Sequence, residues 1–167
     1  MEYGIRFISG EPKFDSLSVI KLCCETSIDI NSRIYGQAQV GRSEDLLYAK
    51  ILSFESEPDQ NSTVWAKFEY NGKIIEFSVR FDNSAKLLVN KVDRTDALTC
   101  YITSGEDLQG EYWGAVIMLP LSVLFEGLEI NESSLPITLK GNIARENPEI
   151  SSAVALNDAA NFILMQK

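Results

Sequence analysis

Apolar and polar residues alternate along much of this chain with the period of a half-buried β-strand. The clearest example is a pair of alternating runs on either side of Asn71-Gly72. That dipeptide favours a two-residue type I′ turn, because both residues tolerate positive φ angles. We therefore predict a β-hairpin over residues 63–81, with Tyr70 paired to Lys73 beside the turn.

This register divides the predicted hairpin into two unlike faces. The apolar face, which is expected to pack on the core, pairs Phe68 with Ile75, Ala66 with Phe77 and Val64 with Val79. The polar face pairs Trp65 with Ser78, Lys67 with Glu76 and Thr63 with Arg80. The largest aromatic ring of the hairpin thus lies among polar and charged residues, which is a first indication of a binding surface.

Shorter runs rich in β-branched and aromatic residues recur along the rest of the chain, separated by turn residues. They predict further strands at residues 3–8, 18–24, 33–40, 46–54, 85–92, 97–103, 112–119 and 133–142. One helical turn is predicted at 121–125, loops at 25–32 and 143–148, and a short helix or a closing strand in the tail over 153–165. About ten short strands with little helix predict a single all-β domain over residues 1–167, an antiparallel β-sandwich with a small barrel as the alternative.

The composition narrows the range of partners. Asp and Glu number 24 against 15 Lys and Arg, and the resulting net charge of −9 disfavours a nucleic acid partner. No apolar run approaches the roughly 20 residues of a membrane span, so we expect no membrane partner. The first residues carry no secretory signal, which predicts a cytoplasmic protein, or a secreted one if a signal has been removed.

The chain contains no histidine, which excludes Ser-His and Cys-His nucleophile pairs and imidazole metal ligands. Its three cysteines, Cys23, Cys24 and Cys100, are odd in number and are expected to be reduced. Acidic pairs such as Glu55 and Glu57 are interpreted as turns on a solvated surface. We therefore expect a protein that is not an enzyme and that uses neither a cofactor nor a metal. Its oligomeric state is not predicted.

Three short motifs, in chain order, resemble a known family. They are Tyr112-Trp113-Gly114, Leu119-Pro120-Leu121 and Gly141-Asn142. This series resembles the family 9 carbohydrate-binding modules and their short stand-alone, DOMON-like relatives. A weaker match lies at residues 62–69, a Trp-containing strand, with Ile75-Glu76-Phe77 following.

The resemblance implies a β-sandwich that binds sugars without hydrolysing them, in a cleft where aromatic side chains hold a pyranose ring. Two departures concern the sugar site. Residue 66 is Ala where the family has Asp, and residues 143–148 replace the aromatic, Lys-Cys and His-rich continuation of the short relatives. The resemblance therefore predicts the fold more strongly than it predicts an intact sugar site.

Sugar recognition requires a flat aromatic face and polar groups for neighbouring hydroxyls. The candidate ligand-binding residues are Trp65, Ser78, Arg80, Trp113, Asn142, Arg145 and Glu146. Each candidate has an alternative interpretation that remains open. In these, Trp65 is covered by a loop, Trp113 packs in the core, and Asn142, Arg145 and Glu146 lie in a solvated loop.

The leading hypothesis is a non-catalytic carbohydrate-binding protein whose partner is a saccharide. The alternative is a related sandwich that has lost sugar binding and serves as an interaction or structural protein. A glycosidase ranks third, because it needs two carboxyl groups that face one cleft, and sequence spacing does not establish such a pair.

Overall fold

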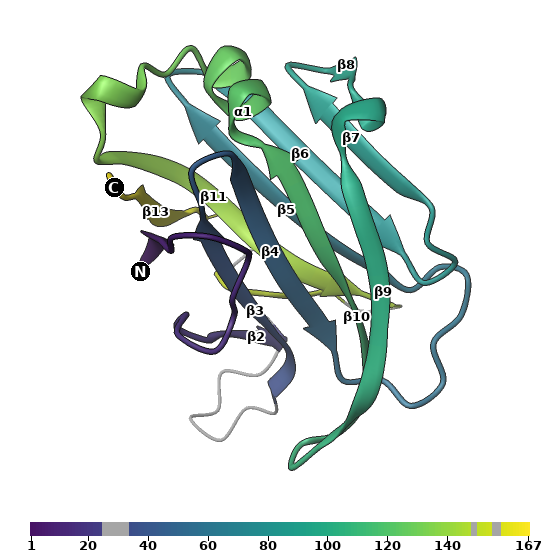
Figure 1. Ribbon diagram of the computed structural model, residues 1–167. Coiled ribbons are helices and arrows are strands. Elements are labelled where there is room, and N and C mark those ends of the chain that lie inside the picture. Colours follow the sequence, from purple (N-terminus) through teal and green to yellow (C-terminus); the bar gives the residue numbers. More distant parts are fainter. Residues whose placement is uncertain (25–33, 148–149, 155–157) are drawn as a thin grey trace.

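The computed structural model describes residues 1–24, 34–147, 150–154 and 158–167, and the loop predicted at 25–32 lies outside them (Figure 1). The described residues form strands along most of their length, so the predicted all-β class is confirmed. The strands are β1 (Glu2–Phe7), β2 (Ile20–Cys24), β3 (Ile34–Arg42), β4 (Leu46–Ser53), β5 (Thr63–Tyr70), β6 (Lys73–Arg80), β7 (Ala85–Val89), β8 (Val92–Asp93), β9 (Thr99–Asp107), β10 (Gly110–Pro120), β11 (Ile137–Glu146), β12 (Ile150–Ser152) and β13 (Ala160–Leu164). The α-helix α1 spans Leu121–Leu128, and two 3₁₀ turns span Thr95–Ala97 and Glu132–Ser134.

The strands do not form two separate antiparallel sheets. They belong to one hydrogen-bonded sheet of 13 strands in the described part of the chain. Six of them close a ring in the order β11, β12, β2, β3, β1 and β13. Within that ring β1 runs parallel to both β13 and β3. The predicted antiparallel sandwich is therefore corrected to a closed ring with extensions, since the chain's first and last strands join the two halves.

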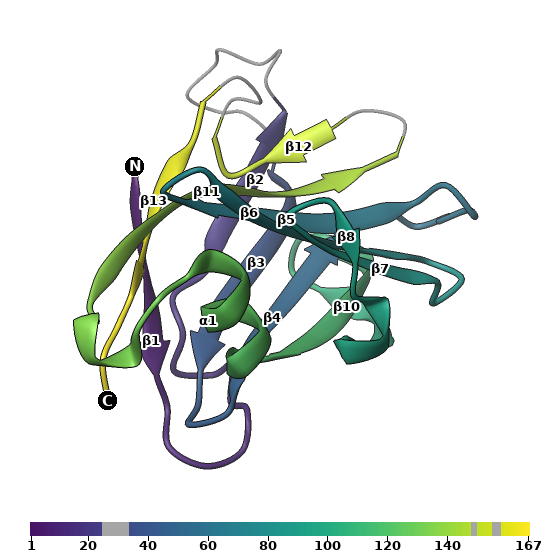
Figure 2. The same ribbon diagram turned by 90° about the horizontal axis from the view of Figure 1, so that it is seen from above.

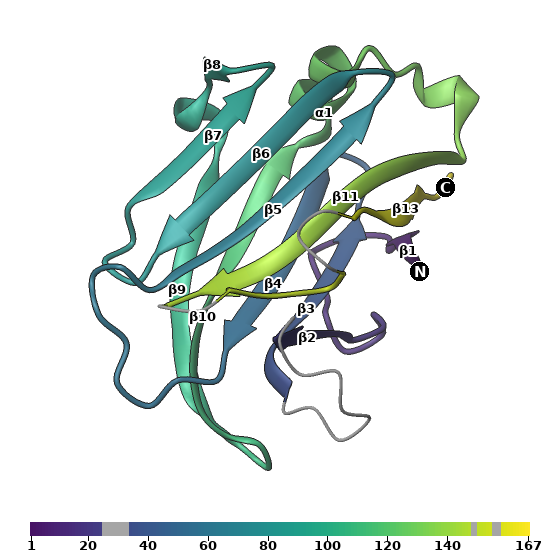
Figure 3. The same ribbon diagram turned by 180° about the vertical axis from the view of Figure 1, so that it is seen from behind.

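Two arms extend from this ring. One arm continues from β11 through β5, β6, β7 and β8, and the other continues from β3 through β4, β10 and β9. Figure 2 shows the arms facing one another, with α1 at one end beside β6, β10 and β4. Their facing sides are apolar and buried, as in Phe68, Phe77, Ile51 and Ile117. The outer side of the first arm is seen in Figure 3, where β11, β5, β6 and β7 lie side by side.

The predicted hairpin is confirmed in both turn and register. Strands β5 and β6 pair Tyr70 with Lys73 and Thr63 with Arg80, as the sequence predicts. Asn71 and Gly72 have φ angles of 48° and 77°, which are the positive values of a type I′ turn. The alternation of buried and exposed residues in β5 follows directly, since successive side chains point to opposite faces.

The end of the chain is less well predicted. Residues 143–148 were expected to form a loop, but β11 continues to Glu146 because it pairs with β5 on one side and with β12 on the other. The buried polar residues Asn142 and Arg145 break the apolar pattern there and hide the strand. In the tail, the closing-strand alternative is confirmed by β13, and the described residues of 153–165 contain no helix.

Steric crowding explains why the first residue of the Gly141-Asn142 motif is glycine. A Cβ atom at Gly141 would lie 2.3 Å from the carbonyl oxygen of Lys67 and 2.9 Å from the Phe68 ring on β5. The backbone oxygen cannot move away without disturbing the β5–β11 ladder. Close approach of these two strands therefore requires a residue without a side chain.

We predict that Gly141→Ala lowers the free energy of unfolding by about 2 kcal/mol, because the strands must separate to admit the methyl group. Gly4→Ala on β1 is the matched control, since its Cβ would meet only the Arg6 side chain, at 4.0 Å. That control is expected to change stability by less than about 0.5 kcal/mol. Urea unfolding followed by circular dichroism measures both, and equal effects of the two variants would contradict the steric explanation.

Candidate functional site

A hollow lies on the outer face of the first arm, over the polar side of the hairpin. Its volume is about 610 Å³, which is within the range of small-molecule sites. The residues that line it are Asn61, Thr63, Trp65, Ala66, Lys67, Glu76, Phe77, Ser78, Arg80, Lys86, Leu88 and Glu146. The lining therefore combines the aromatic residues Trp65 and Phe77 and the apolar residues Ala66 and Leu88 with residues that form hydrogen bonds or carry charge.

The pairing of four strands arranges this lining in rows that cross the sheet. The middle row contains Ala144, Trp65, Ser78 and Lys86, from β11, β5, β6 and β7 in turn. Trp65 thus has a small neighbour on each side, and its ring is half-buried. Small residues beside a large ring leave space next to its faces, which explains why the hollow forms here.

Apart from Leu88, the rows on either side of Trp65 consist of polar and charged residues. One row contains Glu146, Thr63 and Arg80, and the other contains Asn142, Lys67, Glu76 and Leu88. The cations Lys67, Arg80 and Lys86 are exposed. Within the described residues, none of these three cations forms an ion pair or a side-chain hydrogen bond. Their charges are therefore available to a ligand.

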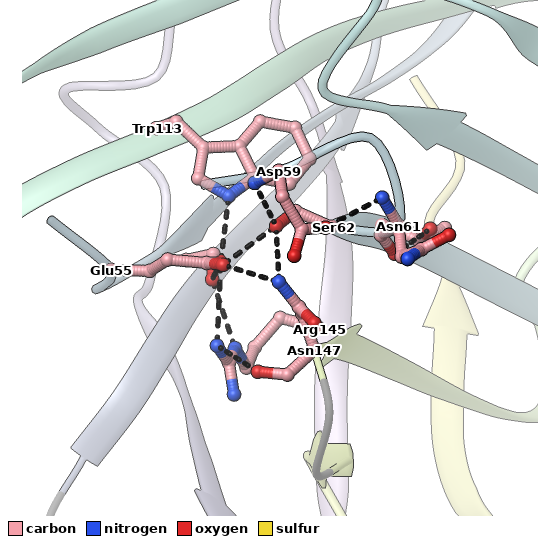
Figure 4. Close-up of polar contacts among 9 residues, drawn as sticks. Glu55, Asp59, Asn61, Ser62, Trp113, Arg145 and Asn147 are labelled. Atoms are coloured by element: carbon pink, nitrogen blue, oxygen red, sulfur yellow. Dashed lines mark hydrogen bonds and ion pairs between the residues drawn. The ribbon is translucent and has the colours of Figure 1, made fainter. Parts of the chain in front are cut away.

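A buried polar network centred on Glu55 lies beside the hollow (Figure 4). The Glu55 carboxylate accepts hydrogen bonds from Ser53 Oγ at 2.8 Å, Ser62 Oγ at 2.6 Å, Trp113 Nε1 at 2.9 Å and Asn147 Nδ2 at 2.9 Å. Arg145 forms an ion pair with Glu55 at 3.4 Å and donates to Ser53 Oγ at 2.9 Å. The network therefore joins the end of β4, the loop before β5, β10 and the end of β11.

Burial alone would raise the pKa of the Glu55 carboxyl, because the charged form loses its water. The hydrogen bonds from Ser62, Trp113, Asn147 and Ser53 outweigh burial, and the pKa is lowered from its ordinary value. The expectation that Glu55 belongs to a solvated acidic turn is wrong, since its side chain is only 11% exposed. Glu57 in the same loop is exposed, as expected.

The structure divides the seven predicted ligand-binding residues into two groups. Trp65, Ser78, Arg80 and Glu146 line the hollow together. Trp113, Asn142 and Arg145 are buried, with exposed fractions of 1%, 7% and 5%, so their side chains do not reach the hollow. We therefore leave these three out of the proposed site.

Each of the three buried residues has partners inside the protein. Trp113 and Arg145 belong to the Glu55 network. Trp113 also touches Phe81 edge to face and borders a second hollow of about 410 Å³. Asn142 donates to the carbonyl oxygen of Val154 at 3.0 Å and accepts from the Val154 amide at 3.3 Å. Asn142 thus holds the segment after β12 against β11.

Sequence reasoning missed Lys86, although a signal for it was present. The Asp82-Asn83-Ser84 turn predicts that the next strand pairs with β6, and extending the hairpin register across it places Lys86 opposite Ser78. Asn147 and Ser62 carried no such signal, because their contacts with Glu55 join segments far apart in the sequence.

No helix in the described part of the chain is long and apolar enough to cross a membrane. No group of three or more His, Cys, Asp or Glu side chains there is placed to hold a metal ion.

We predict that Glu55→Gln lowers the free energy of unfolding by about 3 kcal/mol at neutral pH, because it removes the buried ion pair with Arg145 and the charged acceptor of four hydrogen bonds. The lowered pKa means that this stabilisation is present at neutral pH and is lost as the pH falls below the ordinary Glu range, near 4. The wild-type protein should therefore lose more stability than Glu55→Gln between pH 7 and pH 3.

Glu57→Gln, in the same loop but exposed, is the matched control for this prediction. Urea unfolding at a series of pH values measures all three proteins. A parallel acid response of the wild type and Glu55→Gln would show that Glu55 does not contribute in this way.

The geometry can be compared with known proteins. No protein-family model matches the chain, and no curated protein matches its sequence. Solved structures do match over nearly the whole chain. A family 9 carbohydrate-binding module from Caldicellulosiruptor kristjanssonii in complex with glucose superposes with a TM-score of 0.63 at 8% identity, covering 98% of this chain and 96% of the module.

The same organism's family 9 module in complex with cellotriose gives a TM-score of 0.62 at 9% identity, covering 100% of this chain and 95% of the module. A candidate carbohydrate-binding protein from Bacteroides uniformis gives 0.62 at 13% identity, with 98% of each chain covered. The resemblance inferred from the motifs is therefore confirmed at the level of the fold: this chain has the fold of the family 9 carbohydrate-binding modules.

Proposed function

We propose that this protein binds a saccharide in the hollow on the outer face of β5 and β6. The observation that carries the proposal is the Trp65 ring, which stands half-buried between Ala144 and Ser78 and lines open space. A flat aromatic face of this kind complements the C–H face of a pyranose ring. The surrounding Ser78, Arg80 and Glu146 supply the donors and acceptors that hydroxyl groups require.

The fold likeness supports this proposal. Two of the similar structures are carbohydrate-binding modules that hold glucose and cellotriose. The hollow also has a suitable size, since pockets of several hundred cubic ångströms accommodate small ligands. The sequence predicts a sugar-binding protein, and the hollow offers the aromatic ring and the hydrogen-bonding groups that such a protein requires.

We further propose that binding occurs without catalysis. The carboxylates that line the hollow belong to Glu76 and Glu146. They stand two strands and two rows apart, which separates their Cα atoms by roughly 16 Å at ordinary sheet spacings. Glycosidases use two carboxyl groups roughly 5 to 10 Å apart that face one another across the substrate. Here the residue directly opposite Glu76 is Lys67 and the residue directly opposite Glu146 is Thr63, so neither carboxylate has the other as its neighbour.

The alternative is an interaction or structural protein that has lost sugar binding. The burial of Trp113, Asn142 and Arg145 favours this alternative, because these three candidate residues do not line the hollow and cannot contact a ligand there. Against it stands the unpaired state of the hollow's cations within the described residues.

The direct test is calorimetric titration with a panel of monosaccharides and oligosaccharides. We expect at least one saccharide to bind the wild-type protein, and Trp65→Ala to weaken that binding by about tenfold or more, as loss of a central aromatic contact does. Tyr101→Ala is the matched control, since Tyr101 is 52% exposed on β9, outside the hollow.

The control variant should bind like the wild type. Absence of any binding across the panel, or equal losses in the two variants, would overturn the proposed function and favour the interaction protein. Turnover of a chromogenic glycoside, lost on changing Glu76 or Glu146 to Gln, would instead establish a glycosidase.

A further inference from the structure

The charges around the hollow differ in sign from the protein as a whole. The chain carries a net charge of −9, yet the hollow is lined by the cations Lys67, Arg80 and Lys86 and by only two carboxylates, Glu76 and Glu146. At physiological ionic strength charges are screened over about 8 Å, so the nearby cations determine what a ligand experiences there. The overall acidity acts mainly at longer range.

The positive charge is concentrated on one side of the hollow. Lys67 has a carboxylate directly opposite it in the β5–β6 ladder, namely Glu76. Arg80 and Lys86 have no such neighbour, because Thr63 lies opposite Arg80 and Ser78 lies opposite Lys86. Arg80 and Lys86 are therefore the two cations of the hollow that have no carboxylate directly opposite them in the ladder.

Two carboxylates in adjacent turns lie near these cations. Asp82 is held by hydrogen bonds from the Ser84 side chain and backbone, and Arg80 adds to the lowering of its pKa. Asp93 is held by hydrogen bonds from Thr95, and Lys86 adds to the lowering of its pKa. Neither forms an ion pair with those cations among the described residues. The two cations therefore remain free to meet a ligand.

The position of these cations relative to Trp65 sets where an anionic group would lie. Ser78 is at the centre, with Trp65 on the neighbouring strand to one side and Lys86 on the neighbouring strand to the other. Arg80 is two residues further along the strand of Ser78, a distance of about 7 Å. A sugar stacked on Trp65 would cover Ser78 and turn its far edge toward Arg80 and Lys86.

We propose that the saccharide bound in this hollow is acidic, with its anionic group held between Arg80 and Lys86. This inference rests on the proposed saccharide binding and specifies its ligand class. The arginine guanidinium matches the two oxygens of a carboxylate, and the lysine ammonium adds a point charge. A uronic acid places its carboxylate at the edge of the pyranose ring, which suits this arrangement, and a sulfated sugar carries the same charge with a different geometry.

The test compares sugars that differ only in this group. Methyl glycosides of glucuronic and galacturonic acid are titrated calorimetrically against those of glucose and galactose, against the uncharged uronamides, and against the corresponding 6-sulfates. We expect the uronic acids to bind about tenfold more tightly than their neutral counterparts, a preference that weakens between about 20 and 200 mM NaCl. Tighter binding of the sulfates would keep the anionic class and assign the group as a sulfate ester.

Two charge variants refine the test. Lys86→Gln should remove most of the preference for the acidic sugar, measured as the ratio of its affinity to that of the neutral sugar in the same variant. Lys21→Gln is the matched control, since Lys21 is exposed on β2 and does not line the hollow. The preference of the Lys21→Gln variant for the acidic sugar should equal that of the wild type.

The outcomes separate this inference from the proposed function. Equal binding of neutral sugars, uronamides and uronic acids would overturn the acidic class and leave saccharide binding in place. Binding of no sugar would overturn both. Binding of sodium acetate or sulfate as tightly as the acidic sugars would show a simple anion site, which also overturns the inference.

Discussion

The register in which β5 pairs with β6 and β11 decides the character of this protein's outer surface. In the observed register Trp65 stands between Ala144 and Ser78 and faces outward, while Val64 and Phe68 face the core. A shift by one residue would exchange the two sets of side chains, placing a tryptophan and charges in the core. The tight turn at Asn71-Gly72 fixes this register from one end, and the close approach of Gly141 to Lys67 fixes it on the other side of β5.

The Glu55 network supports that arrangement from beside the hollow. It links segments of both arms, since Ser53 and Trp113 come from one arm, while Arg145 lies on β11 beside β5 and Asn147 directly follows β11. Ser62, immediately before β5, is buried and donates to the same carboxylate. Asn147 in turn donates to Ser62 Oγ, so these hydrogen bonds tie the start of β5 to the network. The network therefore positions the start of β5 and the end of β11, which carry the lining residues Thr63 and Glu146.

The sequence predicted those features that depend on local pattern. The hairpin, its register and the shared face of Trp65, Ser78 and Arg80 follow from alternation and turn chemistry, and they are correct. The ring closure depends on pairing between β1 and β13, at opposite ends of the chain, which no local pattern records. The burial of Glu55, Asn142 and Arg145 was missed for the same reason, because their partners come from distant segments.

The central claim is that a saccharide contacts the Trp65 ring in the hollow. The chain contains only two tryptophans, so a ¹H–¹⁵N correlation spectrum shows two indole N–H signals, and Trp65→Phe assigns them. Titration with a binding saccharide is expected to shift the Trp65 indole signal, because its ring is half-buried beside open space. The Trp113 signal should stay in place, because that N–H is held by Glu55 inside the protein. A saccharide that binds and shifts the Trp113 signal alone would contradict this account.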